Sequence, residues 1–100
     1  MMRKKMSAEE IEKGLNNLPG WNLENDNLKK RFEFKDFAES IGFVNQVGAI
    51  AEQMDHHPDI FFGWGYAKFS ITTHDCGGLT EKDFALAEKI EELLTADKRG

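Results

Sequence analysis

The chain has 100 residues, 40% hydrophobic and 31% charged, a composition typical of one globular domain over residues 1–100 rather than of a disordered segment. Thirteen basic and eighteen acidic residues give a formal net charge of −5, and we expect no nucleic-acid partner because such a field repels a phosphate backbone. We also expect a cytoplasmic protein without a membrane partner, since the sequence has no apolar run of spanning length, no export signal and a single cysteine, Cys76.

The first third of the chain predicts a helix followed by a hairpin. Ser7 and Glu10 match a capping box that opens a helix over residues 8–18. The next stretch, "GWNLENDNLKKRFEF", alternates between apolar and polar residues on either side of "ENDN". This alternation indicates two strands joined by a turn.

A long second helix is predicted after the hairpin. Asp36 is its expected cap, and its end is expected at Asp55 or His56, because Pro58 disfavours helical backbone in the residue before it. Apolar residues recur at steps of three and four and predict one buried stripe. The stripe comprises Phe37, Ile41, Val44, Val47, Ala51 and Met54.

The last part of the chain predicts a second hairpin and a third helix. Residues 60–74 alternate again, and the alternation places His74 on the more polar face of the sheet. Thr80 with Asp83 forms a further capping-box pattern, which makes Asp83 a helix cap. The expected apolar stripe of this helix comprises Phe84, Ala87, Ile90 and Leu94.

The element order α-β-β-α-β-β-α predicts an α+β fold, a two-layer sandwich in which a four-stranded antiparallel sheet carries three helices on one face. Most of the aromatic side chains are expected to pack in the core or in the hairpins. These are Trp21, Phe61, Phe62, Trp64 and Tyr66, of which Trp21 could instead cover a flat ligand.

All three histidines lie within residues 55–75, "DHHPDIFFGWGYAKFSITTHD". Glu52 precedes His56 by four residues, so its carboxylate is expected to reach the His56 ring and stabilise the protonated imidazole. Histidine exchanges protons near neutral pH, and a reaction that removes a proton and expels hydroxide needs two such groups. The cluster therefore predicts an acid–base site formed by His56, His57 and His74.

Two alternatives remain open on the residues alone. The three histidines with Asp55 or Asp75 could hold a zinc ion, although adjacent histidines usually point apart. The same pocket, or the open face of the sheet, could also bind a small molecule or a protein partner without catalysis.

The segments "AEQMDHHPD" and "FSITTHDCGGLTEKDFALAEKIEEL", together with the early "LPGW", resemble the pterin-4a-carbinolamine dehydratase family over nearly the whole chain. The joint pattern H-H-P and T-H-x-x-x-G-L-T-x-x-D carries the resemblance. It implies dehydration of 4a-hydroxytetrahydropterin to quinonoid dihydropterin, in the recycling of a pterin cofactor.

The resemblance also implies roles for individual residues. The implied catalytic residues are His56, His57 and His74. The implied pterin contacts are Asp55, His56, His57, Thr72, Thr73, His74 and Asp75, and the implied supporting residues are Glu52, Pro58, Asp83 and Trp21. No metal and no organic cofactor is implied, the partner is the pterin substrate, and the expected assembly is a homodimer or homotetramer that joins sheet edges.

Overall fold

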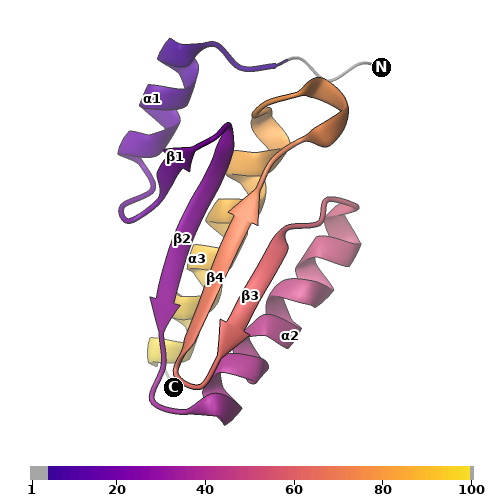
Figure 1. Cartoon of the computed structure of the whole chain (residues 1–100). Coiled ribbons are helices and arrows are strands. Elements are labelled where there is room, and N and C mark those ends of the chain that lie inside the picture. Colours follow the sequence, from indigo (N-terminus) through magenta and orange to yellow (C-terminus); the bar gives the residue numbers. More distant parts are fainter. Residues whose placement is uncertain (1–4, 100) are drawn as a thin grey trace.

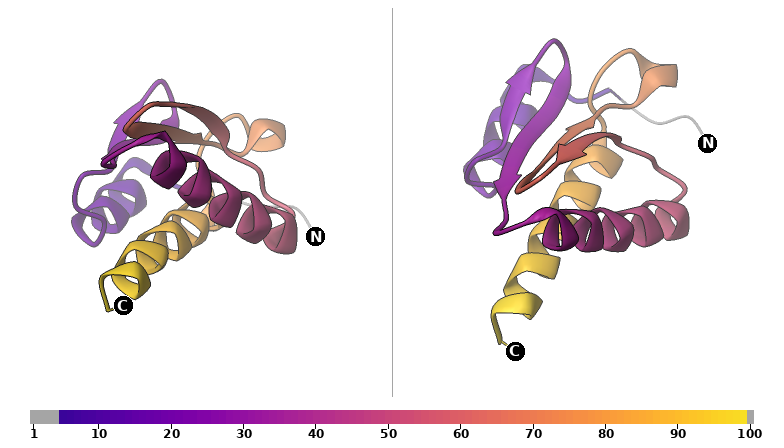
Figure 2. Two further views of the ribbon diagram at one scale, coloured as in Figure 1. Left: turned by 90° about the horizontal axis from the view of Figure 1, so that it is seen from below. Right: turned by 60° about the horizontal axis from the view of Figure 1, so that its bottom comes forward.

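The structure is a computed structural model that describes residues 5–99, with side chains as far as Thr95. Its elements are α1 (Ala8–Asn16), β1 (Asn22–Glu24), β2 (Asn27–Glu33), α2 (Phe37–Met54), β3 (Asp59–Gly63), β4 (Tyr66–Ile71), the 3-10 helix η1 (His74–Cys76) and α3 (Glu81–Arg99). The strands form one antiparallel sheet in the order β1-β2-β4-β3. In the described residues the three α-helices all lie on one side of this sheet (Figure 1, Figure 2), which confirms the predicted α+β fold.

The two hairpin turns follow from residues that tolerate positive φ. Asn25 and Asp26, in the middle of "ENDN", have φ values of 51° and 63°, the pattern of the two-residue turn that matches the twist of paired strands. Gly65 has φ of 80° in the β3–β4 turn. The resulting register pairs Leu28 with Ile71, and both side chains are fully buried on the helical side.

The helix starts agree with the predicted caps. Ser7 and Glu10 form a reciprocal capping box, and the Asp36 side chain accepts the Glu39 N–H. The first helix ends at Asn16 instead of residue 18, because Pro19 disfavours helical backbone in the residue before it.

The buried face of α2 differs from the predicted stripe. Its buried residues are Ser40, Phe43, Val47 and Ala51, whereas Phe37 and Ile41 are exposed and Val44 and Met54 are only partly buried. This helix is apolar on more than one face, so the spacing of its apolar residues does not specify which of them meet the sheet. For α3 the prediction is confirmed at Phe84, Ala87 and Ile90, which are buried, and Leu94 packs partly buried against the core.

Two aromatic residues of the β3–β4 hairpin lie outside the core. Phe61 is 64% exposed but stacks on Tyr66, which agrees with the expected packing within the hairpin. Trp64, in the turn, is 71% exposed, so the expectation that it packs was wrong. In the described part of the chain, no helix has the length and apolar character needed to cross a membrane.

Candidate active site

The end of α2 turns His56 into the protein. The helix stops at Met54, one residue before the earliest predicted end, and Asp55 caps it in the left-handed conformation with φ of 52°. The His56 N–H then donates to the Ala51 carbonyl at 3.1 Å and the Asp55 N–H to that of Glu52 at 3.3 Å. This is the Schellman pattern of helix termination, and the reversal leaves His56 only 6% exposed.

Asp83, in the first turn of α3, forms a hydrogen bond with the buried His56 ring. The carboxylate has no exposed surface, and its Oδ1 lies 2.7 Å from His56 Nε2. Its Oδ2 accepts the Thr80 N–H at 2.7 Å and the Thr73 hydroxyl at 2.8 Å. Asp83 is therefore a helix cap, as predicted, and also the residue that joins α2, the end of β4 and α3.

Glu52 bonds a different histidine from the one expected. Its Oε2 lies 2.5 Å from His57 Nε2, and both side chains are mostly exposed. The expectation of a Glu52–His56 pair was wrong because it assumed helical geometry through residue 56, whereas the left-handed Asp55 reverses the chain one residue earlier. The adjacent histidines thus point apart, one buried and one exposed.

His74 also lies elsewhere than the alternation predicted. β4 ends at Ile71, Thr73 forms an isolated bridge with Gly78, and His74 begins η1, beyond the sheet. The turn is closed by Gly77, whose φ is 68°. His74 is exposed and directly follows Thr73, so the backbone that carries it is linked to His56 through the single carboxylate of Asp83.

The other expected pterin contacts are distributed around this turn. Asp55 and Asp75 are exposed. The Thr72 hydroxyl donates to the Asp26 carbonyl at 2.9 Å, and Thr73 is buried with its hydroxyl on Asp83. The two threonine hydroxyls are therefore already used within the protein, and Pro58 is half-buried in the loop between α2 and β3.

Trp21 lies in the core, apart from the histidines. Its ring packs edge-on against Phe32, and its Nε1–H donates to Glu91 Oε2 at 2.8 Å. Glu91 Oε2 also accepts a hydrogen bond from Lys30 Nζ at 2.6 Å. Since Glu91 lies eight residues after Asp83 on the same helix, about 12 Å along its axis, this arrangement supports the core interpretation of Trp21 over the ligand-covering one.

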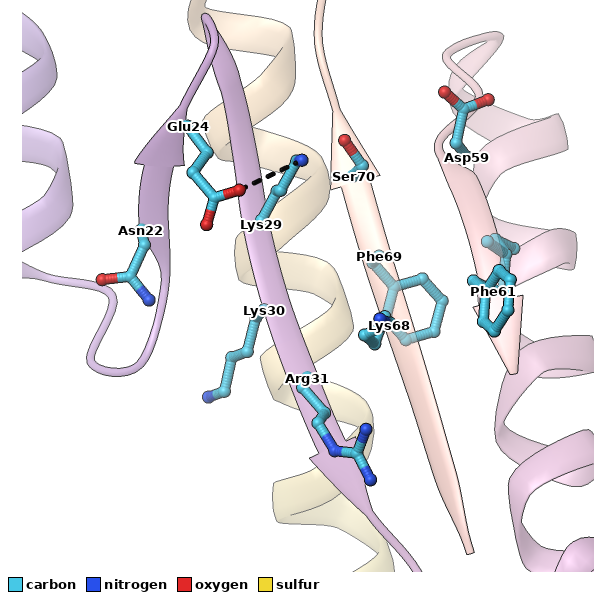
Figure 3. Close-up of a pocket in the computed structure, with 11 residues that line it drawn as sticks. Asn22, Glu24, Lys29, Lys30, Arg31, Asp59, Phe61, Lys68, Phe69 and Ser70 are labelled. Atoms are coloured by element: carbon cyan, nitrogen blue, oxygen red, sulfur yellow. Dashed lines mark hydrogen bonds and ion pairs between the residues drawn. The ribbon is translucent and has the colours of Figure 1, made fainter. Parts of the chain in front are cut away.

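One hollow of the described surface lies away from the histidines. It is a groove of about 520 Å³ on the open face of the sheet, bordered by Lys29, Arg31, Lys68, Phe61 and Asp59 among others (Figure 3). Its cations are close to anions or rings: Lys29 pairs with Glu24, and Lys68 lies over the Phe61 ring. The groove contains no histidine and no buried charged pair, so it lacks the acid–base groups that the sequence predicts.

The described residues contain no group of three His, Cys, Asp or Glu side chains placed to hold a metal ion. His56 and His57 each direct a ring nitrogen to a separate carboxylate. The alternative of a three-histidine zinc site therefore finds no support in this arrangement.

Comparison with known proteins links the chain to one family. The family model described as pterin 4 alpha carbinolamine dehydratase matches residues 4–93. Relatives named after the same family include proteins of Rubrobacter xylanophilus, 45% identical over 88% of this chain and 83% of the relative, and of Thermosynechococcus vestitus, 47% identical over 92% and 97%. A relative from Sulfurisphaera tokodaii is 45% identical over 92% of this chain and 99% of its own length.

Two solved structures are also similar. A structure described as a transcriptional coactivator/pterin dehydratase from Brucella melitensis matches with a TM-score of 0.86 and 31% identity, over 89% of this chain and 97% of that one. A pterin dehydratase-like protein described as a RuBisCO assembly factor of the alpha-carboxysome matches with a TM-score of 0.61 and 26% identity, over 73% and 84%.

Proposed function

Because the chain belongs to the pterin 4 alpha carbinolamine dehydratase family, we propose that it dehydrates 4a-hydroxytetrahydropterin to quinonoid dihydropterin and water. The observation that carries the proposal is the buried His56–Asp83 pair, joined through Thr73 to the turn that presents His74. This arrangement supplies two imidazoles on neighbouring segments, as a dehydration with proton transfer at two atoms requires.

The proposed reaction breaks the bond between C4a and its hydroxyl oxygen. An acid protonates the departing hydroxyl, which leaves as water, and the lone pair of the neighbouring ring nitrogen forms the new carbon–nitrogen double bond. A base takes the proton of that nitrogen. The protons balance within the reaction, and no oxidant, reductant or metal is consumed.

We assign the acid and base roles to His56 and His74, and the holding of the pterin to His57 with Asp55 and Asp75. The end of α2 and the turn after β4 lie at the same end of the sheet (Figure 1). His57, His74 and Asp55 belong to these two segments and are exposed, which suits contact with a bound molecule. Because the Thr72 and Thr73 hydroxyls are used internally, this segment would meet the pterin through its backbone.

The test follows the decay of freshly generated 4a-hydroxytetrahydropterin with and without the protein. We expect the wild-type chain to accelerate decay and His74→Ala to lower the rate constant roughly a hundredfold to ten-thousandfold, with an unchanged fold because His74 is exposed. Lys68→Ala, in the groove on the open sheet face, is the control and should retain full activity.

Three results would count against the proposal. An active His74→Ala removes that residue from the mechanism, and an inactive Lys68→Ala moves the site to the groove. A wild-type chain that binds pterin without accelerating its decay would support the alternative of a binding module without catalysis. The likeness to the RuBisCO assembly factor favours that alternative.

A further inference from the structure

Thr73 is part of a buried hydrogen-bond chain whose direction can be derived. As a carboxylate, Asp83 can only accept hydrogen bonds, so the single hydroxyl proton of Thr73 is donated to Asp83 Oδ2 at 2.8 Å. The second contact of Thr73 Oγ1, with Thr80 Oγ1 at 2.9 Å, must then be accepted from Thr80. Thr80 Oγ1 in turn accepts the Lys82 N–H at 3.3 Å. Each proton donated along this series of hydrogen bonds therefore points toward Asp83.

The same reasoning fixes the His56 ring. Since Asp83 Oδ1 is an acceptor, His56 Nε2 carries a proton and donates it at 2.7 Å. Nδ1 is then the nitrogen left to exchange a proton with a substrate, and it has no hydrogen-bond partner among the described residues. No buried side-chain nitrogen or oxygen in the described part lacks a partner, so Nδ1 lies on the small exposed part of the ring.

We propose that Thr73 is a positioning residue of the dehydratase site: its hydroxyl fixes the orientation of the Asp83 carboxylate, so that Oδ1 faces His56 Nε2, keeps the proton there and leaves Nδ1 as the reacting nitrogen. This inference rests on the proposed function and replaces the expectation that the Thr73 side chain touches the pterin. Thr73 is only 2% exposed, which leaves its hydroxyl no surface for a ligand.

The first experiment needs no substrate. Long-range ¹H–¹⁵N correlation spectra of the ligand-free wild-type protein should show His56 with its proton on Nε2. Thr73→Val, which keeps the shape and removes the hydroxyl, should mix the two tautomers, and Thr73→Ser should restore the wild-type spectrum. Ser40→Ala is the matched control because it also removes one buried hydroxyl bond, to the Asp36 carbonyl, far from the histidines.

The second experiment measures dehydration by the same variants. A lost hydrogen bond to a charged group predicts a fall in kcat of about tenfold to a hundredfold for Thr73→Val with an unchanged KM, whereas Ser40→Ala and Thr73→Ser should stay near wild type. A raised KM with unchanged kcat would instead make Thr73 a substrate contact and overturn the proposal.

The two experiments separate failure of this inference from failure of the proposed function. A wild-type His56 protonated on Nδ1 alone overturns the positioning role even if Thr73→Val does not fold, because that spectrum needs no variant. A wild-type protein with the Nε2 proton but no dehydratase activity sustains the hydrogen-bond chain and overturns only the reaction.

Discussion

Asp83 accepts more hydrogen bonds than a helix cap requires. Three groups from three segments of the chain donate to one carboxylate that has no exposed surface: the His56 ring, the Thr73 hydroxyl and the Thr80 N–H. Buried polar groups are costly when they lose a partner, since water cannot replace it. The same residue therefore contributes to stability and to the orientation of His56.

Replacing Asp83 with alanine tests the stability contribution. Three buried donors lose their acceptor, each at a cost of about 1 kcal/mol or more, so we expect the free energy of unfolding to fall by about 3 kcal/mol. Urea unfolding followed by circular dichroism measures this change. Glu52→Ala is the matched control, because Glu52 also bonds a histidine but is exposed, and such surface pairs contribute little. Equal losses in the two variants would contradict the difference in burial.

The sequence could predict that carboxylates lie beside the histidines, but not which carboxylate bonds which histidine. Spacing in the sequence predicted Glu52 beside a histidine, and the family resemblance implied Asp83 as a supporting residue; each carboxylate does bond a histidine. The pairing depended on the conformation of one residue, Asp55, which spacing does not reveal. Thr73 was missed as an internal donor because its partners lie 7 and 10 residues along the chain, across a turn closed by Gly77.

Among the helices and strands, it is the C-terminal end of α2 that determines where the site forms. Pro58 predicts that the helix stops, and the structure adds how: the left-handed Asp55 allows the His56 N–H to bond the Ala51 carbonyl. The helix therefore ends with one histidine directed to Asp83 and the next to Glu52. A non-glycine residue in this conformation is uncommon, which indicates that the backbone at residue 55 is under some strain.

Asp55→Gly tests that indication. Glycine adopts positive φ without a steric cost, so we expect Asp55→Gly to raise the free energy of unfolding by up to about 1 kcal/mol. Asp55→Ala keeps the Cβ atom at φ of 52° and should be less stable than the glycine variant. Thermal unfolding of the three proteins gives the ranking. An alanine variant at least as stable as the glycine one would show that backbone strain at residue 55 is not the deciding factor.

The faces of the strands were easier to predict than the faces of α2. Alternation along the strands puts Leu28 and Phe32 on one face of β2 and Phe69 on one face of β4, and all three are buried. In α2 the spacing assigned Phe37 and Ile41 to the core, but both are exposed. Because the apolar residues of α2 lie on more than one face, their spacing does not orient the helix, and its exposed apolar residues need a different explanation.

In the molecule as a whole, several exposed apolar side chains of α2 and of the β3–β4 hairpin lie near the open edge of the sheet. β3 is a terminal strand that pairs only with β4 among the described strands, so one side of its backbone has hydrogen-bonding groups free for another strand. Phe61 on β3, Trp64 in the following turn, and Phe37 and Ile41 on the neighbouring α2 are all exposed. Phe37 stacks on Phe62 of β3, which ties the α2 residues to this edge.

We expect this edge to pair with the β3 edge of a second copy, giving the homodimer or homotetramer that the family resemblance implies. Phe61→Glu should convert the assembly to a monomer of 11.4 kDa, because a charge on an edge strand opposes association. The variant should still fold, since residue 61 lies opposite Lys68 and a glutamate there forms a favourable cross-strand pair. Sedimentation velocity measures the mass.

Leu23→Glu is the control at the other edge of the sheet, on β1, where an exposed leucine lies on a strand of only three residues. It should leave the assembly unchanged, because so short a strand offers few backbone groups to a partner. A wild-type chain that sediments as a monomer at micromolar concentration would refute pairing at β3. An assembly that is dissociated by Leu23→Glu and not by Phe61→Glu would place the contact at β1, and the exposed aromatic residues along β3 would then have to serve a partner other than a second copy.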